Sequence, residues 1–138
     1  MDSKALRMGL EANRLFLAAS ALPASTAPGD VEYRQSLLNQ AIDLRICEWR
    51  EFSQSSEPCQ KLGAAQAAQA LGVYHAESQE YEQAGAWFER ALEVCPSPTA
   101  WSKRSWYFTC FGDSLRCLVR EQLARVQQLS AETPAATP

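Results

Sequence analysis

The 138-residue chain has little of the residue pattern that builds β-sheets, because its β-branched residues are scattered and nowhere alternate with polar residues over a strand-length run. It also lacks an apolar run approaching the ~20 residues that a membrane-spanning helix needs. With 46% hydrophobic residues and a formal net charge of -3, the composition is that of an ordinary globular domain. The sequence therefore predicts an all-α domain with a hydrophobic core.

Residues that support catalysis or metal binding are equally scarce. His75 is the only histidine, and the chain contains no Gly-rich phosphate loop and no paired-carboxylate motif. The five cysteines form no Cys-x-x-Cys pair, which argues against a zinc site and a disulfide scaffold. We therefore predict a non-enzymatic protein without cofactor or metal, whose thiols are reduced and packed as small apolar residues. The enzymatic alternative would need a pocket around His75 and a cysteine.

The stretch 65–98 carries the most specific pattern in the chain. Alanines and Leu71 favour a first helix, in which Gly72 lets another helix approach closely. Apolar residues at three- and four-residue steps favour a second helix, which Pro96 ends. The residues that carry the pattern are Leu71-Gly72, His75, Tyr81, Ala84, Phe88, Ala91 and Pro96. This pattern resembles the tetratricopeptide repeat, a helical scaffold that binds other proteins.

The resemblance is partial over 98–130 and weak over 3–52. Trp101, Phe108, Cys117 and Ala124 each lie 33 residues after a position of the central unit, so the pattern recurs with a constant shift. Phe111-Gly112-Asp113 falls where the family turns between its two helices. Departures from the family pattern are Ala68 in place of an aromatic residue, His75 in place of tyrosine, Arg104-Ser105 in place of Leu-Gly, and Glu121 in place of a large apolar residue.

From these signals we predict a single domain over 1–129 made of three helix pairs. The pairs cover 3–52, 58–95 and 99–129, with individual helices expected at 3–22, 31–52, 58–77 and 79–95 and a last pair that turns at Phe111-Gly112-Asp113. The Ala/Thr/Pro-rich tail 130–138 is predicted to be disordered. The resemblance implies a right-handed stack of about six antiparallel helices, a short tetratricopeptide-like superhelix.

The resemblance also implies a binding groove on the first helix of each pair, which accepts a peptide or helix of another protein. The corresponding positions here are Gln66, Gln69, Val73, Ser102, Trp106 and Thr109. Solvated helix surface is the alternative for these residues. Trp106 lies off the stripe formed by Trp101 and Phe108, which is typical of an interface anchor, with burial against a neighbouring helix as the alternative.

Basic residues are concentrated near the carboxyl end. The segment 101–129 holds five basic and two acidic residues, a formal charge of +3, which leaves -6 on the remainder. A basic contact face there would include Lys103, Arg104, Arg116 and Arg120. A solvated face or an acidic protein partner explains this charge as well as phosphate binding does, so a nucleic-acid partner is not favoured.

The sequence thus predicts a non-catalytic protein-interaction module that acts as an adaptor, chaperone or assembly factor. The alternative is a constitutive structural subunit of a larger complex, and a homodimer is left open. The thiols favour a reducing intracellular compartment, the cytoplasm first. Organellar import is left open because Lys4, Arg7 and Arg14 precede the apolar stretch 15–22, although Asp2 and Glu11 favour a core helix there.

Overall fold

The computed structural model describes residues 3–22, 27–96 and 106–132, and within 106–111 it describes the backbone alone. It contains five helices in these ranges: α1 Ser3–Ala21, α2 Pro28–Ser53, α3 Pro58–Glu77, α4 Tyr81–Val94 and α5 Trp106–Glu132. No strand occurs there, so the prediction of an all-α fold is confirmed for the described part of the chain. No helix in that part has the length and apolarity needed to cross a bilayer.

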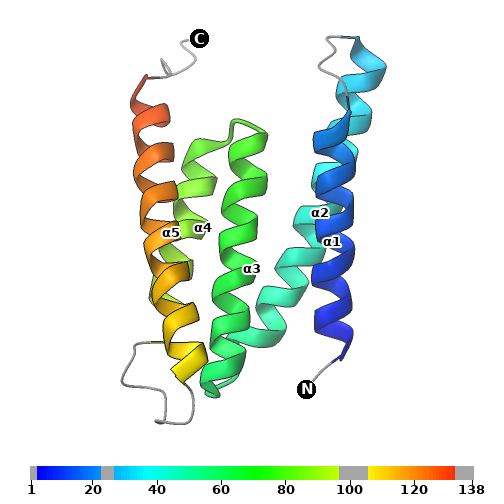
Figure 1. Ribbon diagram of the computed structural model, residues 1–138. Helices are drawn as coiled ribbons and strands as arrows, with labels where there is room; N and C mark the ends of the chain where they lie inside the picture. The colour runs from blue at the N-terminus through cyan, green and yellow to red at the C-terminus, as the bar shows by residue number, and fades with distance from the viewer. Residues whose placement is uncertain (1–2, 23–26, 97–105, 133–138) are drawn as a thin grey trace.

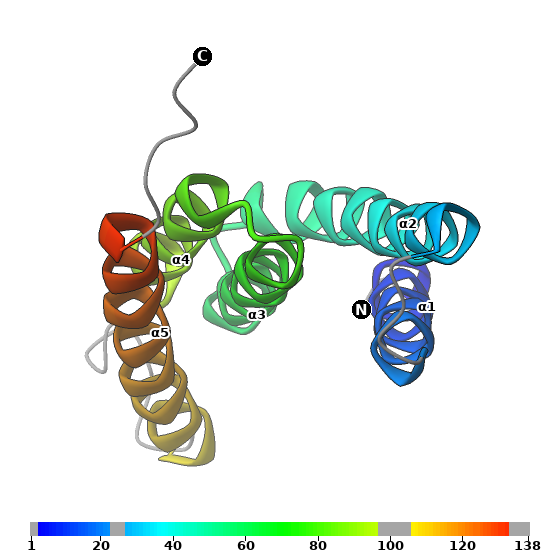
Figure 2. The same cartoon turned by 90° about the horizontal axis from the view of Figure 1, so that it is seen from above.

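The helices form two layers (Figure 1, Figure 2). One layer contains α1, α3 and α5, which run in the same direction, and the other contains α2 and α4, which run in the opposite direction. Each helix packs against the next one along the chain, and α3 also contacts α5. The helix α3 therefore lies in the middle of the molecule, with helices on both sides.

The core consists of two main clusters that meet at α3. One cluster joins α1, α2 and α3 around Leu38 and Leu71, and the other joins α3, α4 and α5 around Phe88 and Val119. The alanines of α3 belong to this core, and four of them are fully buried: Ala64, Ala65, Ala67 and Ala68. Because alanine favours helix and has a small side chain, α3 can be packed closely on both flanks.

The turn between α3 and α4 has the hydrogen bonds of a Schellman motif. The amide of Glu80 donates to the carbonyl of His75 at 2.9 Å, and the amide of Gln79 donates to the carbonyl of Ala76 at 3.0 Å. Gln79 adopts a φ of 62°, the left-handed conformation that this motif requires and that glycine adopts without strain. The expected start of the second helix at residue 79 is therefore wrong, and α4 begins at Tyr81.

We expect the substitution Gln79→Gly to raise the free energy of unfolding by up to about 1 kcal/mol, because it removes the steric cost of a side chain at positive φ. Chemical denaturation of the two proteins measures the difference. The control is Gln83→Gly, which places glycine at an exposed position inside α4 and should instead destabilise the protein by about 1 kcal/mol. Destabilisation by both changes would contradict the assigned turn.

The expected turn at Phe111-Gly112-Asp113 is wrong, because α5 runs through these residues without interruption. Glycine inside a helix costs about 1 kcal/mol, but burying each large aliphatic side chain contributes about 1.5–3 kcal/mol. The residues of α5 that are buried against the core are Leu115, Val119 and Val126. Gly112 is itself buried, and its carbonyl accepts a hydrogen bond from the thiol of Cys95 at 3.7 Å.

The start of α2 and the end of α5 differ from the predicted bounds. The second helix begins at Pro28 rather than near Val31, because proline is suited to the first helical position and the carbonyl of Ala27 accepts from the amides of Asp30 and Val31. The third helix begins at Pro58 as predicted.

At the carboxyl end, residues 130–132 belong to α5, so the prediction that disorder begins at residue 130 is wrong for these three residues. The rest of the predicted tail, 133–138, lies outside the described residues.

Candidate protein-binding site

The three groove residues predicted on the central helix lie on one face of α3. Gln66 is exposed, and Gln69 and Val73 are half-buried. They follow each other at three- and four-residue steps, so they share a face, while the other faces of α3 are taken by the two core clusters. Val73 packs against both clusters at the edge of this face. The structure therefore brings together the half of the predicted groove that comes from α3.

Residues of α5 border this face of α3. The side-chain amide of Gln69 donates to Gln122 at 3.1 Å and thereby joins α3 to α5. Residues 118, 122, 125 and 129 share one side of α5 by their spacing, and Leu118 among them is 44% exposed. The α3 face is defined here by Gln66, Gln69, Val73 and Gln122, none of which is charged. Arg125, which is exposed, lies beside it on the same side of α5.

The remaining predicted groove residues are only partly described. Trp106 and Thr109 lie in the first two turns of α5, where the backbone alone is described. Ser102 lies outside the described residues, as do Lys103 and Arg104 of the predicted basic face. Their contribution to binding stays a prediction.

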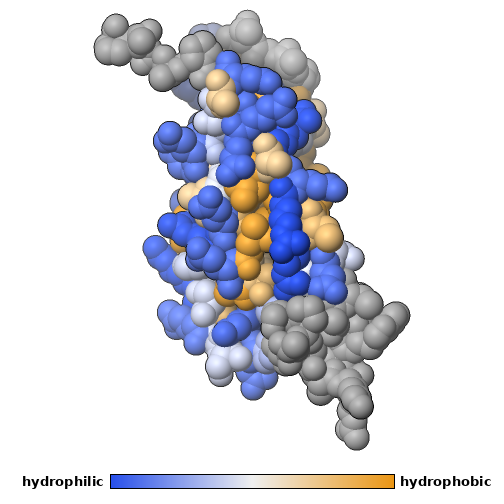
Figure 3. Space-filling view, turned by 90° about the vertical axis from the view of Figure 1, so that its left-hand side faces the viewer, coloured by the Kyte–Doolittle hydropathy of each residue, from blue (hydrophilic) through white to orange (hydrophobic). Residues whose placement is uncertain are grey.

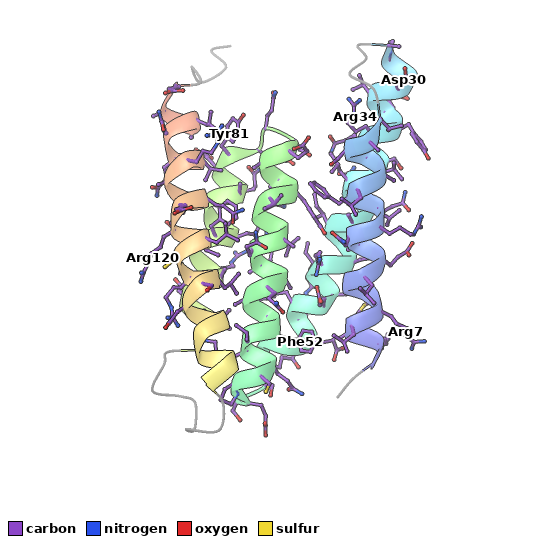
Figure 4. All side chains as sticks on the ribbon, viewed as in Figure 1. Arg7, Asp30, Arg34, Phe52, Tyr81 and Arg120 are labelled. Carbon is purple, nitrogen blue, oxygen red and sulfur yellow. The ribbon has the colours of Figure 1, made fainter. Side chains whose placement is uncertain are left out.

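The two described arginines of the predicted basic face differ in their surroundings. The guanidinium of Arg116 donates to Asp113 at 2.9 Å, to the carbonyl of Pro96 and to the sulfur of Cys95 at 3.7 Å. Arg116 therefore links α5 to Cys95 and Pro96, the two residues that follow α4. Arg120 is exposed, and Figure 4 shows it projecting away from α5 on the side opposite α3. Of the two, Arg120 is the one whose charge faces solvent.

A buried ion pair connects α1, α2 and α3. Arg45 donates to Glu48 at 2.7 Å and to the hydroxyl of Tyr74 at 3.1 Å, and Tyr74 stacks on Phe16 of α1 with ring centroids 4.6 Å apart. Glu48 is only 6% exposed. A Cβ at Gly9 would lie 2.9 Å from the Glu48 carboxyl carbon, so glycine allows α1 to approach this pair. Sequence patterns did not identify the pair, because a glutamate on a helix is usually solvated.

Burial raises the pKa of Glu48 above its ordinary value of 4.5, and Arg45 offsets only part of that rise. The folded protein therefore binds this proton more tightly than the unfolded chain does. The stabilisation due to the protonated carboxyl is fully present below the unfolded-state pKa and is lost as the pH rises through the raised folded-state pKa.

We expect the unfolding free energy of the wild type, measured relative to that of Glu48→Gln, to fall as the pH rises from about 4.5 towards neutrality. The variant carries a neutral amide that does not titrate, so the difference isolates this carboxyl. Denaturation at a series of pH values measures it. If the unfolding free energy of the wild type relative to Glu48→Gln rises with pH instead, the prediction is contradicted. Arg45 would then stabilise the carboxylate by more than burial destabilises it.

The side chains considered for catalysis have structural contacts. The Nδ1 atom of His75 lies 3.3 Å from a carboxylate oxygen of Glu80, across the α3–α4 turn. Cys95 is buried, and this burial raises its thiol pKa above 9.0 although Arg116 lowers it in part. The expectation of packed thiols is correct for Cys95 and wrong for the cysteines that are exposed: Cys47, Cys59 and Cys117. No cluster of three metal-ligating side chains occurs in the described ranges.

A second surface, which the sequence did not predict, lies between α4 and α5. Figure 3 shows an apolar strip running lengthwise down this side of the molecule, with hydrophilic surface on both sides. A groove of about 430 Å³ lies between α4 and α5 on this side of the molecule (Figure 1). Its lining residues, which define the α4–α5 groove, are Tyr81, Glu82, Gly85, Ala86, Glu89, Leu123, Val126, Gln127, Ser130 and Ala131. The signal that could have revealed it is the pair Gly85-Ala86, which leaves α4 without large side chains at this position.

The outer side of α1 is also apolar. Leu6, Leu10 and Leu17 are 44%, 71% and 56% exposed, and their spacing of four and seven residues places them on one side of the helix. The buried residues of α1 lie on its other side and include Ala12 and Leu15. Both ends of the helix stack therefore expose apolar side chains.

Comparisons of the chain with protein families, with curated proteins and with solved structures found no match. The resemblance to the tetratricopeptide repeat consequently stays a prediction that rests on the residues of 65–98.

Proposed function

We propose that the chain is a non-catalytic protein-interaction module, an adaptor, chaperone or assembly factor, which binds a peptide or helix of another protein on the α3 face. The observation that carries the proposal is the stripe Gln66, Gln69 and Val73, exposed or half-buried on a helix whose other sides belong to the core. We propose in addition that the two layers are a short right-handed stack of the tetratricopeptide type, in an intracellular reducing compartment.

The packing supports this proposal in two ways. The helix α3 is fixed by both core clusters, so residues on its outer face are held by a rigid element, as a binding surface requires. The uncharged glutamine side chains offer hydrogen bonds to a backbone or side chain without the desolvation cost of a charge. The four uncharged residues of the α3 face are suited to a protein partner, and Arg125 beside them is a single cation, which gives little attraction to a polyanion.

The substitution Gln66→Arg should reduce partner binding at least tenfold while leaving the melting temperature within about 2 °C, because Gln66 is exposed and makes no contact in the core. The partner is captured with the wild-type chain and its affinity is then measured by calorimetry. The control Gln83→Arg makes the same change on the outer side of α4 and should bind normally. The parallel variant Trp106→Ala should weaken binding more than folding.

Equal loss of binding in Gln66→Arg and Gln83→Arg would contradict the proposed location of the site. Unchanged binding by Gln66→Arg and Trp106→Ala together would contradict the assignment of the α3 face. Circular dichroism confirms beforehand that all variants have the helicity of the wild type.

A second candidate function is that of a constitutive subunit of a larger complex. The leucines exposed on α1 and the apolar α4–α5 groove favour it, because fixed neighbours would cover both surfaces. An obligate subunit should aggregate when it is produced alone and stay in solution when produced with its neighbours. An adaptor should remain monodisperse by itself.

A further inference from the structure

The floor of the α4–α5 groove is apolar and is built from both helices. Gly85 and Ala86 come from α4, and Leu123 and Val126 come from α5. A Cβ at Gly85 would lie 3.8 Å from the Leu123 side chain, so Leu123 comes close to the α4 backbone beneath the groove. The small residues of α4 leave room above this floor. A large aliphatic side chain could therefore pack here.

One edge of the groove is acidic. Glu82 and Glu89 are exposed, and the carboxylate of neither forms an ion pair or hydrogen bond within the described part of the chain. The lining residues include no lysine, arginine or histidine, so the groove has a formal charge of -2. The two carboxylates are seven residues apart on α4, which separates them by two turns, or about 10 Å along the helix. The opposite edge offers the neutral groups of Gln127 and Ser130.

We propose that the α4–α5 groove binds an amphipathic helix of a partner protein, with an apolar stripe over the floor and two basic residues seven positions apart facing Glu82 and Glu89. A helix presents side chains at steps of three, four and seven residues along one side, which matches two carboxylates two turns apart. This site is separate from the α3 face, and so the inference goes beyond the proposed function.

The charge pattern selects this occupant over a second copy of the chain. In a symmetric dimer through this groove, each protomer would present the same two carboxylates, and no cation belongs to the lining to meet them. A basic helix instead places a cation opposite each carboxylate. Like charges would oppose the first arrangement and opposite charges favour the second.

The experiment uses the full chain and two synthetic 18-residue amphipathic peptides. Both carry a leucine and alanine stripe, and they differ in having lysines or glutamates at two positions seven apart. The variant Glu82→Lys/Glu89→Lys reverses the charge of the groove. The control Glu32→Lys/Glu51→Lys makes the same change in net charge at exposed positions on α2. Binding is followed by amide chemical shifts in NMR spectra, after circular dichroism shows that all proteins are equally helical.

We expect the lysine peptide to shift amides within 82–89 and 123–131 and to bind the wild type and the control alike. The groove variant should bind it about tenfold more weakly or worse, and should prefer the glutamate peptide. Equal weakening in the control, shifts confined to another surface, or no binding at millimolar peptide would overturn the proposal. So would a wild-type dimer in sedimentation that the groove variant dissociates. None of these outcomes depends on Gln66, so failure here is distinguishable from failure of the proposed function.

Discussion

Replacing Phe88 with alanine should lower the free energy of unfolding by about 3–5 kcal/mol. Phe88 is 1% exposed, is the largest fully buried side chain of the described core, and packs in the cluster that joins α3, α4 and α5. Its removal leaves a cavity that Gly72, directly beneath the ring, cannot fill. Because a domain of this size is stable by only about 5–15 kcal/mol, we expect the melting temperature to fall by about 10–20 °C.

Calorimetry of the wild type and Phe88→Ala measures this effect. The control is Tyr33→Ala, which removes an aromatic ring that is 57% exposed on α2 and should change the unfolding free energy by about 0.5 kcal/mol or less. Similar losses in the two variants would contradict the position of Phe88 between α3 and α5.

The substitution Gly72→Leu should destabilise the protein by about 1–3 kcal/mol through overpacking. A Cβ at this position would lie 2.5 Å from the Phe88 Cδ1 atom, closer than carbon atoms can pack, and Phe88 is itself buried, so the ring or α4 must shift. The better helix propensity of leucine offsets up to about 1 kcal/mol of a larger steric cost. Chemical denaturation measures the net change.

The matched control is Gly29→Leu, because a Cβ at Gly29 would meet nothing within 4 Å. That change should be neutral or slightly stabilising. The double variant Gly72→Leu/Phe88→Ala should lose less stability than the sum of the two single changes, since the leucine occupies part of the space that the ring leaves. Strict additivity would show that residues 72 and 88 are not in contact.

The sequence predicted best those features that depend on local signals. The helix 58–77, the close approach at Gly72 and the buried stripe of Ala84, Phe88 and Ala91 follow from propensity and periodicity within about 35 residues. The turn between α3 and α4 begins after Glu77 as expected, but it extends to residue 80 because its left-handed residue is Gln79, which carries no glycine signal. Its conformation is fixed by the backbone hydrogen bonds to Ala76 and His75.

Features that depend on tertiary contacts could not be predicted in the same way. Gly112-Asp113 looks like a turn in sequence, yet α5 is continuous because the burial of Leu115 and Val119 in the core outweighs the low helix propensity of glycine. The burial of Glu48 depends on the packing of α1 beside Gly9.

For the candidate site, the spacing placed Gln66, Gln69 and Val73 together on α3 in advance. It could not show that Gln122 of α5 would join them, because that contact spans 53 residues. The α4–α5 groove was missed for a related reason, since its floor combines Gly85 and Ala86 with residues about 40 positions later in the chain.

The measurement that tests the central claim most directly is amide hydrogen exchange of the chain with and without its captured, purified partner. We expect the partner to slow exchange on α3 between Gln66 and Val73 and on the facing stretch of α5 near Gln122, and to leave the outer side of α2 unaffected. We also expect Gln66→Arg to abolish this protection. Binding that protects none of these segments would contradict the claim that the α3 face is the protein-binding site.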